Sequence, residues 1–229
     1  MSVALLRHQP LHSNTPQILR DLLVLLACGF LGQAQMKPVI SKAEVVRIET
    51  ELASDKMQGR KVFTAGIDSA SVFIEKEFAK IGLDYYEGLT NYRQEFKAKG
   101  KAANNVIGVI KGKSKPEEFV VFSAHYDHLG TESGEKDTIY NGANDDASGT
   151  TAVIALAQYF KELNQNERTI IFVAFTAEEV GGYGAGYFSK NINPDKVMAM
   201  FNIEMIGTES KWNKNSAFIT GFDKSDFGT

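Results

Sequence analysis

Histidine and acidic side chains follow several short apolar runs of this sequence, and their types suit the binding of a divalent metal ion. Apolar runs that end at positions 124, 177 and 203 are followed directly by HYDH, EE and E, and NDDASG precedes a further apolar segment. Imidazole nitrogen and carboxylate oxygen are both suitable ligands for Zn²⁺. Because carboxylates gathered without a partner repel one another, a bound cation is the economical explanation for such a group. The residues placed in this way are His125, Asp127, His128, Asp145, Asp146, Glu178, Glu179 and Glu204.

Each of these residues has an ordinary structural interpretation when it is taken alone. A single histidine after a strand, such as His125, is more often packed or solvated than bound to a metal. Asp145 and Asp146 alone are more often a helix cap. Glu178 and Glu179 alone are more often a solvated loop pair. Their joint placement at the ends of four elements favours a metal site over these separate interpretations.

The segments that must position these residues alternate between strand and helix patterns. Between two expected strands, apolar residues at helical spacing predict a helix over 152–163. Strand, helix and strand in this order predict an α/β sheet. Open α/β sheets build their sites at the carboxyl ends of strands, which is where the polar residues lie. Short runs rich in β-branched or aromatic residues predict strands over 105–110, 119–123, 170–175 and 198–203.

Two further helices are expected ahead of the first strand. A capping box formed by Ser41 and Glu44 starts the first of them. Asp68 or Ser69 opens the second, in which apolar residues recur at steps of three and four. Gly82 lies where a left-handed cap would end this second helix.

The composition excludes several classes of function. Hydrophobic residues make up 43% of the 229 residues, which suits a globular domain with a substantial core. The net charge of -3 provides no basic excess for binding phosphates, so we expect no nucleic-acid partner. No repeat or long linker interrupts residues 35–229, which we expect to form one domain. The single cysteine, Cys28, precedes this domain, which therefore contains no disulfide and no cysteine nucleophile.

The first 34 residues differ in pattern from the rest. The apolar run over 22–32 is shorter than the ~20 residues that span a bilayer. Basic residues precede this run and small residues follow it, which predicts a signal peptide over 1–34. The alternatives are a lipoprotein signal that ends at residue 27, ahead of Cys28, and a buried apolar helix. We therefore expect an exported protein without a transmembrane span, located in the periplasm, outside the cell, or at the outer membrane as a lipoprotein.

Taken together, the motifs resemble the secreted bacterial di-zinc aminopeptidases, which belong to the clan that also holds glutamate carboxypeptidase II and glutaminyl cyclase. The resemblance implies an α/β three-layer sandwich with a mostly parallel mixed central sheet flanked by helices, the phosphorylase/hydrolase-like zinc-peptidase fold. It also implies that the substrates are peptides with a free N-terminus. The motifs are LASDKMQGR at 52–60, NVIGVIKG at 105–112, HYDHLG at 125–130, NGANDDASGT at 141–150, TAEE at 176–179 and NIEMIG at 202–207.

The resemblance implies a role for each matching residue. Glu178 would be the general base for the water that attacks the peptide carbonyl. Asp127 would accept the ring N–H of His125 and fix its tautomer. The implied metal ligands are His125 and Glu204 for the first zinc, Glu179 for the second zinc, and Asp145 as a bridge between the two.

Two more residues receive supporting roles from the same resemblance. Asp146 would follow Asp145 across a cis peptide bond and act as structural support. His128 matches a family position that is not a metal ligand. For His128 we therefore expect a hydrogen-bonded histidine at the rim of the site.

One part of the family pattern is absent from this sequence. Family members carry a final histidine downstream of NIEMIG that binds the second zinc, and no histidine follows His128 here. We expect a fragment that lacks the C-terminal part of the catalytic domain, with an incomplete second zinc site and weak or absent turnover. The alternatives are a shortened relative with one metal, a non-catalytic peptide-binding surface protein, and an enzyme that resembles glutaminyl cyclase.

Overall fold

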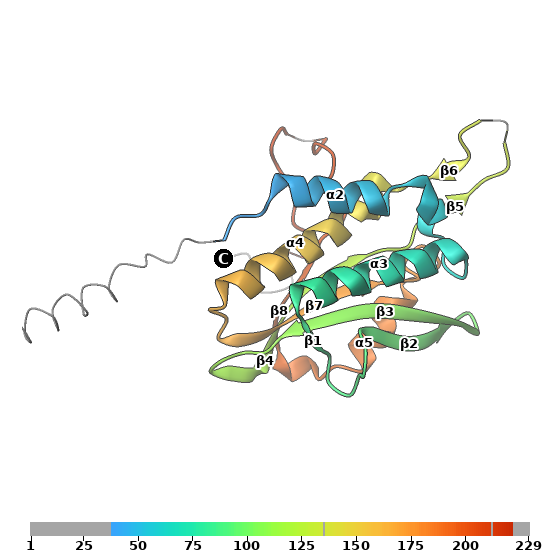
Figure 1. Cartoon of the computed structure of the whole chain (residues 1–229). Coiled ribbons are helices and arrows are strands. Elements are labelled where there is room, and N and C mark those ends of the chain that lie inside the picture. Colours follow the sequence, from blue (N-terminus) through green and yellow to red (C-terminus); the bar gives the residue numbers. More distant parts are fainter. Residues whose placement is uncertain (1–37, 135, 212, 222–229) are drawn as a thin grey trace, which may run out of the picture. The chain divides into compact units, whose positions relative to one another are not determined.

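The computed structural model describes residues 38–134, 136–211 and 213–221. Within this part of the chain, helices pack on a mixed β-sheet (Figure 1). The helices are α2 (Lys42–Leu52), α3 (Ala65–Ile81), α4 (Ser148–Leu163) and α5 (Tyr183–Lys190), and the short helical turns are η1 (Asp55–Arg60), η2 (Ala143–Ala147) and η3 (Pro194–Lys196). The strands are β1 (Asp84–Tyr85), β2 (Arg93–Ala98), β3 (Lys101–Ile110), β4 (Lys115–His125), β5 (Gly130–Thr131), β6 (Ile139–Tyr140), β7 (Arg168–Phe175) and β8 (Val197–Asn202).

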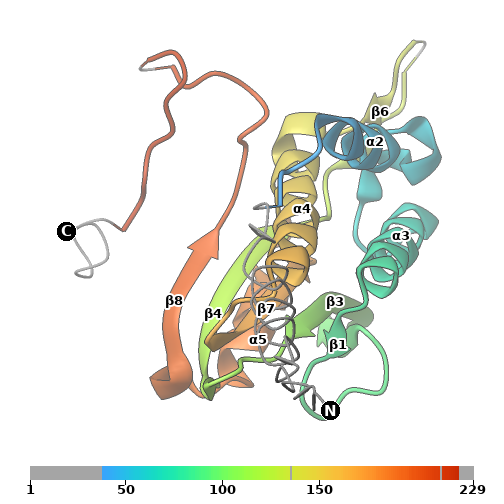
Figure 2. The same ribbon diagram turned by 60° about the vertical axis from the view of Figure 1, so that its left-hand side comes forward.

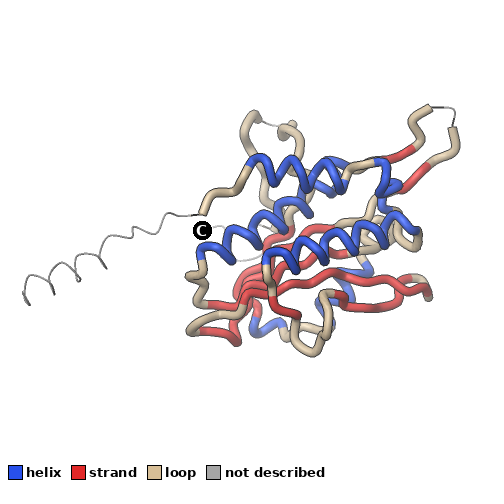
Figure 3. The backbone as a smooth tube through the Cα atoms, viewed as in Figure 1, coloured by secondary structure: helices blue, strands red, loops and turns tan. Residues whose placement is uncertain are grey.

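The main sheet has the strand order β1-β3-β7-β4-β8, and β2 also pairs with β3. β4 runs parallel to both of its neighbours, β7 and β8. β3 is antiparallel to β7, β1 and β2. Figure 3 shows these strands as one layer with helices against it. The mixed sheet is therefore confirmed, and its parallel strands β7, β4 and β8 are the ones whose ends carry the polar residues.

Side chains of β7 point alternately into two cores on opposite faces of the sheet. Phe172 belongs to a buried cluster that includes residues of α2, α3 and α4. Its neighbour Val173 belongs to a second cluster that includes Phe188 of α5. Successive side chains of a strand point to opposite faces, so a strand covered on both faces is apolar throughout. This two-sided burial explains the unbroken apolar run in β7, and Figure 2 shows α4 and α3 together beside the sheet.

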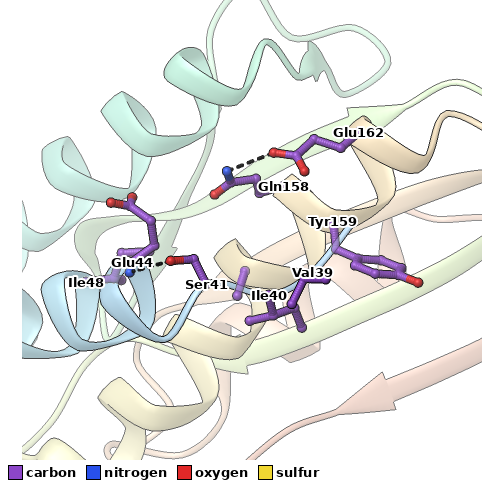
Figure 4. A pocket seen from close by; sticks show the side chains of 9 residues that line it. Val39, Ile40, Ser41, Glu44, Ile48, Gln158, Tyr159 and Glu162 are labelled. Atoms are coloured by element: carbon purple, nitrogen blue, oxygen red, sulfur yellow. Dashed lines mark hydrogen bonds between the residues drawn. The ribbon is translucent and has the colours of Figure 1, made fainter. Parts of the chain in front are cut away.

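The N-terminal end of α2 is capped by a side chain. The hydroxyl of Ser41 accepts a hydrogen bond from the backbone N–H of Glu44 at 3.4 Å, as the capping box predicts. In a complete capping box the Glu44 carboxylate would accept from the backbone N–H of Ser41. Here it accepts hydrogen bonds from Arg47 and Lys80 instead. Figure 4 shows Ser41, Glu44 and Tyr159 of α4 among the residues that line one pocket. The start of α2 is therefore held by its cap and by contact with α4.

Most of the predicted elements are confirmed: β3, β4, β7 and α4 are longer than predicted, and β8 has the predicted length but begins one residue earlier. The expected strands correspond to β3, β4, β7 and β8, and the helix expected over 152–163 is α4. The prediction that Asp68 or Ser69 opens the second helix is wrong, because α3 begins at Ala65 after Thr64. Asp68 lies in the first turn instead, where a carboxylate also favours the helix N-terminus. Gly82 ends this helix in the left-handed conformation, as expected.

The predicted export signal, residues 1–34, lies outside the described residues. Within the described ranges, no helix is both long enough and apolar enough to cross a membrane.

Candidate metal centre

His125 is the last residue of β4, and its side chain is buried at the rim of the sheet, with the whole residue 3% exposed. Its Nε2 lies 3.1 Å from Oδ1 of Asp145. Its Nδ1 lies 3.1 Å from the backbone carbonyl oxygen of Asp127, whereas the nearest carboxylate oxygen of Asp127 is 3.8 Å away. A carbonyl oxygen only accepts, so Nδ1 carries a proton, and Nε2 is the ring nitrogen that faces Asp145.

The facing atoms of His125 and Asp145 indicate where a cation fits. Neither Nε2 of His125 nor Oδ1 of Asp145 makes a hydrogen bond within the described part of the chain, although both atoms are buried. Burial alone would lower the pKa of His125, but Asp127 and the negative charge of Asp146 outweigh it and raise the pKa to about 9. These surroundings therefore favour positive charge, which a divalent ion between imidazole and carboxylate would supply. The donor set of nitrogen and oxygen suits zinc.

The Asp127 carboxylate ties the end of β4 to the segment after β7. It is fully buried, and its two oxygens accept hydrogen bonds from the backbone N–H groups of Glu178 at 3.1 Å and Glu179 at 3.3 Å. The expected contact with the His125 ring is made more closely by the Asp127 carbonyl than by the carboxylate. Asp127 thus orients His125 through its backbone and the glutamate pair through its side chain.

The two glutamates after β7 face different surroundings. Glu179 is partly buried, and its Oε1 lies 2.9 Å from Nδ1 of His128. Glu178 is exposed at the residue level. Partial desolvation of its carboxyl raises the pKa of Glu178, His125 opposes this, and the charges of Asp127 and Glu179 add to it. A raised carboxyl pKa brings a group closer to the range useful for a general base.

Asp146 connects three segments of the rim. The bond between Asp145 and Asp146 is cis, as the resemblance implied. The buried Asp146 carboxylate accepts backbone hydrogen bonds from His125 at 3.2 Å, Gly149 at 3.0 Å and Met205 at 3.1 Å. Burial raises the pKa of Asp146 to about 7, with His125 and these N–H groups opposing the rise. Asp146 therefore joins the end of β4, the start of α4 and the segment after β8.

Glu204 is the predicted ligand that the structure leaves apart. It follows β8 on the same rim, but it is exposed, and its carboxylate accepts a hydrogen bond of 3.4 Å from Asn202. Its charge still contributes to the raised pKa of Glu178. The residue is placed by the end of a strand, but no buried contact fixes the direction of its long side chain.

A different group of potential ligands comes together. In the described part of the chain, the ligand atoms of His128, Asp145 and Glu179 all lie within 4.8 Å of one another. The structure therefore brings His125 to Asp145, and Asp145 to Glu179, as expected. It adds His128, which is buried and bonded to Glu179 as expected for a rim histidine, but which also approaches Asp145.

No sequence pattern gives Arg60 a role, but the structure places its side chain between the end of α2 and the loops that carry the ligands. Its side chain is 0% exposed. The only sequence signal was its position in the motif at 52–60, which carries no chemistry of its own. The guanidinium donates hydrogen bonds to the carbonyl oxygens of Leu52, Tyr126, Asn141 and Gly142. Arg60 thereby links the end of α2 to the loops that carry the ligands.

Known proteins resemble this chain in sequence and in architecture. The model of Peptidase family M28 matches residues 105–225. A probable zinc metalloprotease of Leptosphaeria maculans is 34% identical over 109 residues, which cover 47% of this chain and 25% of that protein. Aminopeptidase YwaD of Bacillus subtilis is 31% identical over 120 residues, which cover 51% of this chain and 24% of that protein. The chain thus spans about a quarter of the length of these two relatives.

A solved structure supports the fold. LapB from Legionella pneumophila superposes with a TM-score of 0.57 and 27% sequence identity, over 74% of this chain and 44% of LapB. The family match covers more than half of the 229 residues and includes every predicted catalytic and metal-binding position. The resemblance seen in the sequence is confirmed, and the chain belongs to Peptidase family M28.

Proposed function

We propose that this protein is a zinc-dependent aminopeptidase that removes N-terminal residues from peptides. The observation that carries the proposal is the buried pair of His125 Nε2 and Asp145 Oδ1, which face each other without hydrogen bonds beside the exposed Glu178. The printed names of relatives agree with it, because one is an aminopeptidase and another a probable zinc metalloprotease. We further propose two zinc ions for the complete domain and export directed by residues 1–34.

Different residues of the rim would bind each of the two zinc ions. His125 and Asp145 would hold one zinc, with Glu204 turned inward from the end of β8. Asp145 and Glu179 would hold the other. Bound zinc supplies a Lewis acid that polarises the peptide carbonyl and lowers the pKa of water. Because Asp127 fixes the His125 ring and the glutamate backbone, these ligands are oriented before metal arrives.

Glu178 would act as the general base. Its carboxylate would accept a proton from the attacking water and then deliver it to the nitrogen of the departing amine. Glu178 can serve in this role because it is exposed toward solvent while its backbone N–H is held by Asp127. Its raised pKa makes the Glu178 carboxylate a stronger base, which favours the step that takes the proton from water.

The charge of the rim would favour a substrate with a free N-terminus. Four carboxylates, those of Asp145, Glu178, Glu179 and Glu204, stand on a rim where His125 and His128 are the imidazoles. Bound zinc would neutralise Asp145, Glu179 and Glu204, so Glu178 is the carboxylate that would attract the positively charged α-amino group of a peptide. An acetylated or otherwise blocked N-terminus carries no such charge, so it would lose this attraction.

The test is a comparison of three substrates with the protein purified from its source cells. We expect an amino-acid anilide to be hydrolysed and its N-acetylated counterpart to be left intact. We expect a peptide with N-terminal glutamine to lose that residue by hydrolysis. Equal cleavage of the acetylated anilide would contradict an aminopeptidase, and conversion of the glutaminyl peptide to pyroglutamate would show a cyclase instead.

A further inference from the structure

His128 lies three residues after His125, in the loop that follows β4, and its side chain is 10% exposed. Its Nδ1 is 2.9 Å from Oε1 of Glu179 and 3.9 Å from Oδ2 of Asp145. The nitrogen therefore faces two carboxylates that come from separate segments of the chain. One nitrogen and two oxygens form a set of three protein ligands, the number typical of a catalytic zinc.

The backbone around His128 holds the ring in this position. The N–H of His128 donates to the carbonyl oxygen of Arg60 at 3.1 Å. On the other side, the ring lies against Gly142, where an added Cβ would come within 2.5 Å of Cδ2 of His128. Gly142 has a φ of 59° and precedes Asp145 in the same loop, so the ring is packed on the segment that carries the shared carboxylate. A larger residue at position 142 would displace the imidazole.

Asp145 has an imidazole near each of its two carboxylate oxygens. Oδ1 faces the unpartnered Nε2 of the buried His125 at 3.1 Å, and Oδ2 is the oxygen that faces His128. A carboxylate that bridges two metal ions uses one oxygen for each ion. The arrangement of His125, Asp145 and His128 therefore provides a nitrogen ligand for each of two ions that share Asp145.

We propose that Nδ1 of His128 is a ligand of the second metal ion, together with Oδ2 of Asp145 and Oε1 of Glu179. The proposal rests on the metal centre of the proposed function and adds a nitrogen ligand to its second site. It replaces our expectation from the sequence that His128 is only a hydrogen-bonded rim histidine. The competing role is a donor that orients Glu179 through the 2.9 Å contact, and amide substitution separates the two roles.

The experiment counts zinc ions and measures their affinities in the 229-residue chain by calorimetric titration with Zn²⁺ alone. We expect two ions in the unaltered chain. In the His128→Ala variant we expect the affinity for one of them to fall by about 100-fold or more, since even the loss of a group that only orients a ligand costs 10- to 100-fold. His128→Gln keeps an N–H donor for Glu179 but offers no imidazole, so it should show the same loss.

Two control variants locate the effect. Glu178→Gln changes a neighbouring carboxylate that is not assigned as a ligand, and it should bind two ions like the unaltered chain. His125→Ala should weaken the other ion, so that the two histidine variants affect different sites. Circular dichroism of each variant without metal checks that the fold is retained. If His128→Ala does not fold, the ¹⁵N chemical shift of Nδ1 of His128 in the unaltered chain, which zinc ligation must change, decides the question.

The inference is overturned if the unaltered chain binds fewer than two zinc ions, if His128→Ala binds both with unchanged affinity, or if His128→Gln restores the affinity. An unchanged Nδ1 shift on saturation with zinc overturns it as well. The anilide assay tests the proposed function separately. Two zinc ions, one of them dependent on His128, in a protein without peptidase activity would uphold the ligand and reject the aminopeptidase.

Discussion

Glu178→Gln should lower the rate of aminoacyl-anilide hydrolysis by about 10²- to 10⁴-fold, the range typical of a lost general base. The amide has nearly the same shape as the carboxylate but cannot accept a proton at neutral pH. The backbone N–H of residue 178 would still bond to Asp127, so the loop should keep its position. Activity and bound zinc should be measured on the same sample, and the zinc content should be unchanged.

Glu179→Gln is the matched control for this prediction. The two glutamates are neighbours, and Asp127 holds the backbone of both, so the substitutions disturb the loop equally. Glu179 contacts His128 within the ligand group, so its substitution should remove zinc from the second site. If Glu178→Gln loses zinc and Glu179→Gln keeps it, the roles of the two glutamates have been exchanged.

Arg60→Leu should lower the free energy of unfolding by about 3 to 5 kcal/mol, the range typical of breaking a buried charged interaction. The side chain is 0% exposed and serves four carbonyl oxygens, which leucine would leave without donors. Burial lowers the pKa of Arg60 to about 10, while the charges of Glu49, Asp127 and Asp146 oppose this shift. The guanidinium is therefore charged at neutral pH, and its loss also removes a buried positive charge that interacts with those carboxylates.

Urea unfolding in the presence of a chelator measures this loss without a contribution from bound zinc. Lys56→Leu is the control, because Lys56 is exposed at the surface and pairs with the partly exposed Glu51. Exposed ion pairs contribute between about 0 and 1 kcal/mol, so this variant should be nearly as stable as the unaltered chain. Equal stability losses in the two variants would contradict the special role of Arg60.

The parts of the fold that the sequence predicted are those with strong local patterns. β7 and β4 are apolar runs because both faces of these strands are covered, and α4 shows helical spacing of its apolar residues. β2 (Arg93–Ala98) escaped prediction, although Phe96 and Ala98 are buried while Glu95 and Lys97 are exposed. Its three buried positions alternate with charged residues, and one of them is the polar Gln94, so the apolar signal was weak.

The positions of site residues could be predicted from the sequence where those residues directly follow a strand. His125 follows β4 directly, and the sheet fixes where its backbone lies, so the sequence placed it correctly beside Asp145. The contact of His128 depends on the packing of its ring against Gly142, a residue of a separate loop. Arg60 and its acceptors are separated by up to 82 residues along the chain, which no local pattern records. Glu204 also follows a strand, but its contacts could not be predicted, because its side chain is exposed and no packing determines its direction.

The central claim is that hydrolysis depends on zinc held at the rim by His125 and Asp145. The most direct measurement follows the rate of aminoacyl-anilide hydrolysis while a chelator removes zinc and added zinc restores it, with bound zinc counted at every step. We predict that the rate falls with the zinc content and returns when zinc is restored. A rate that persists after the zinc has been removed would contradict the claim.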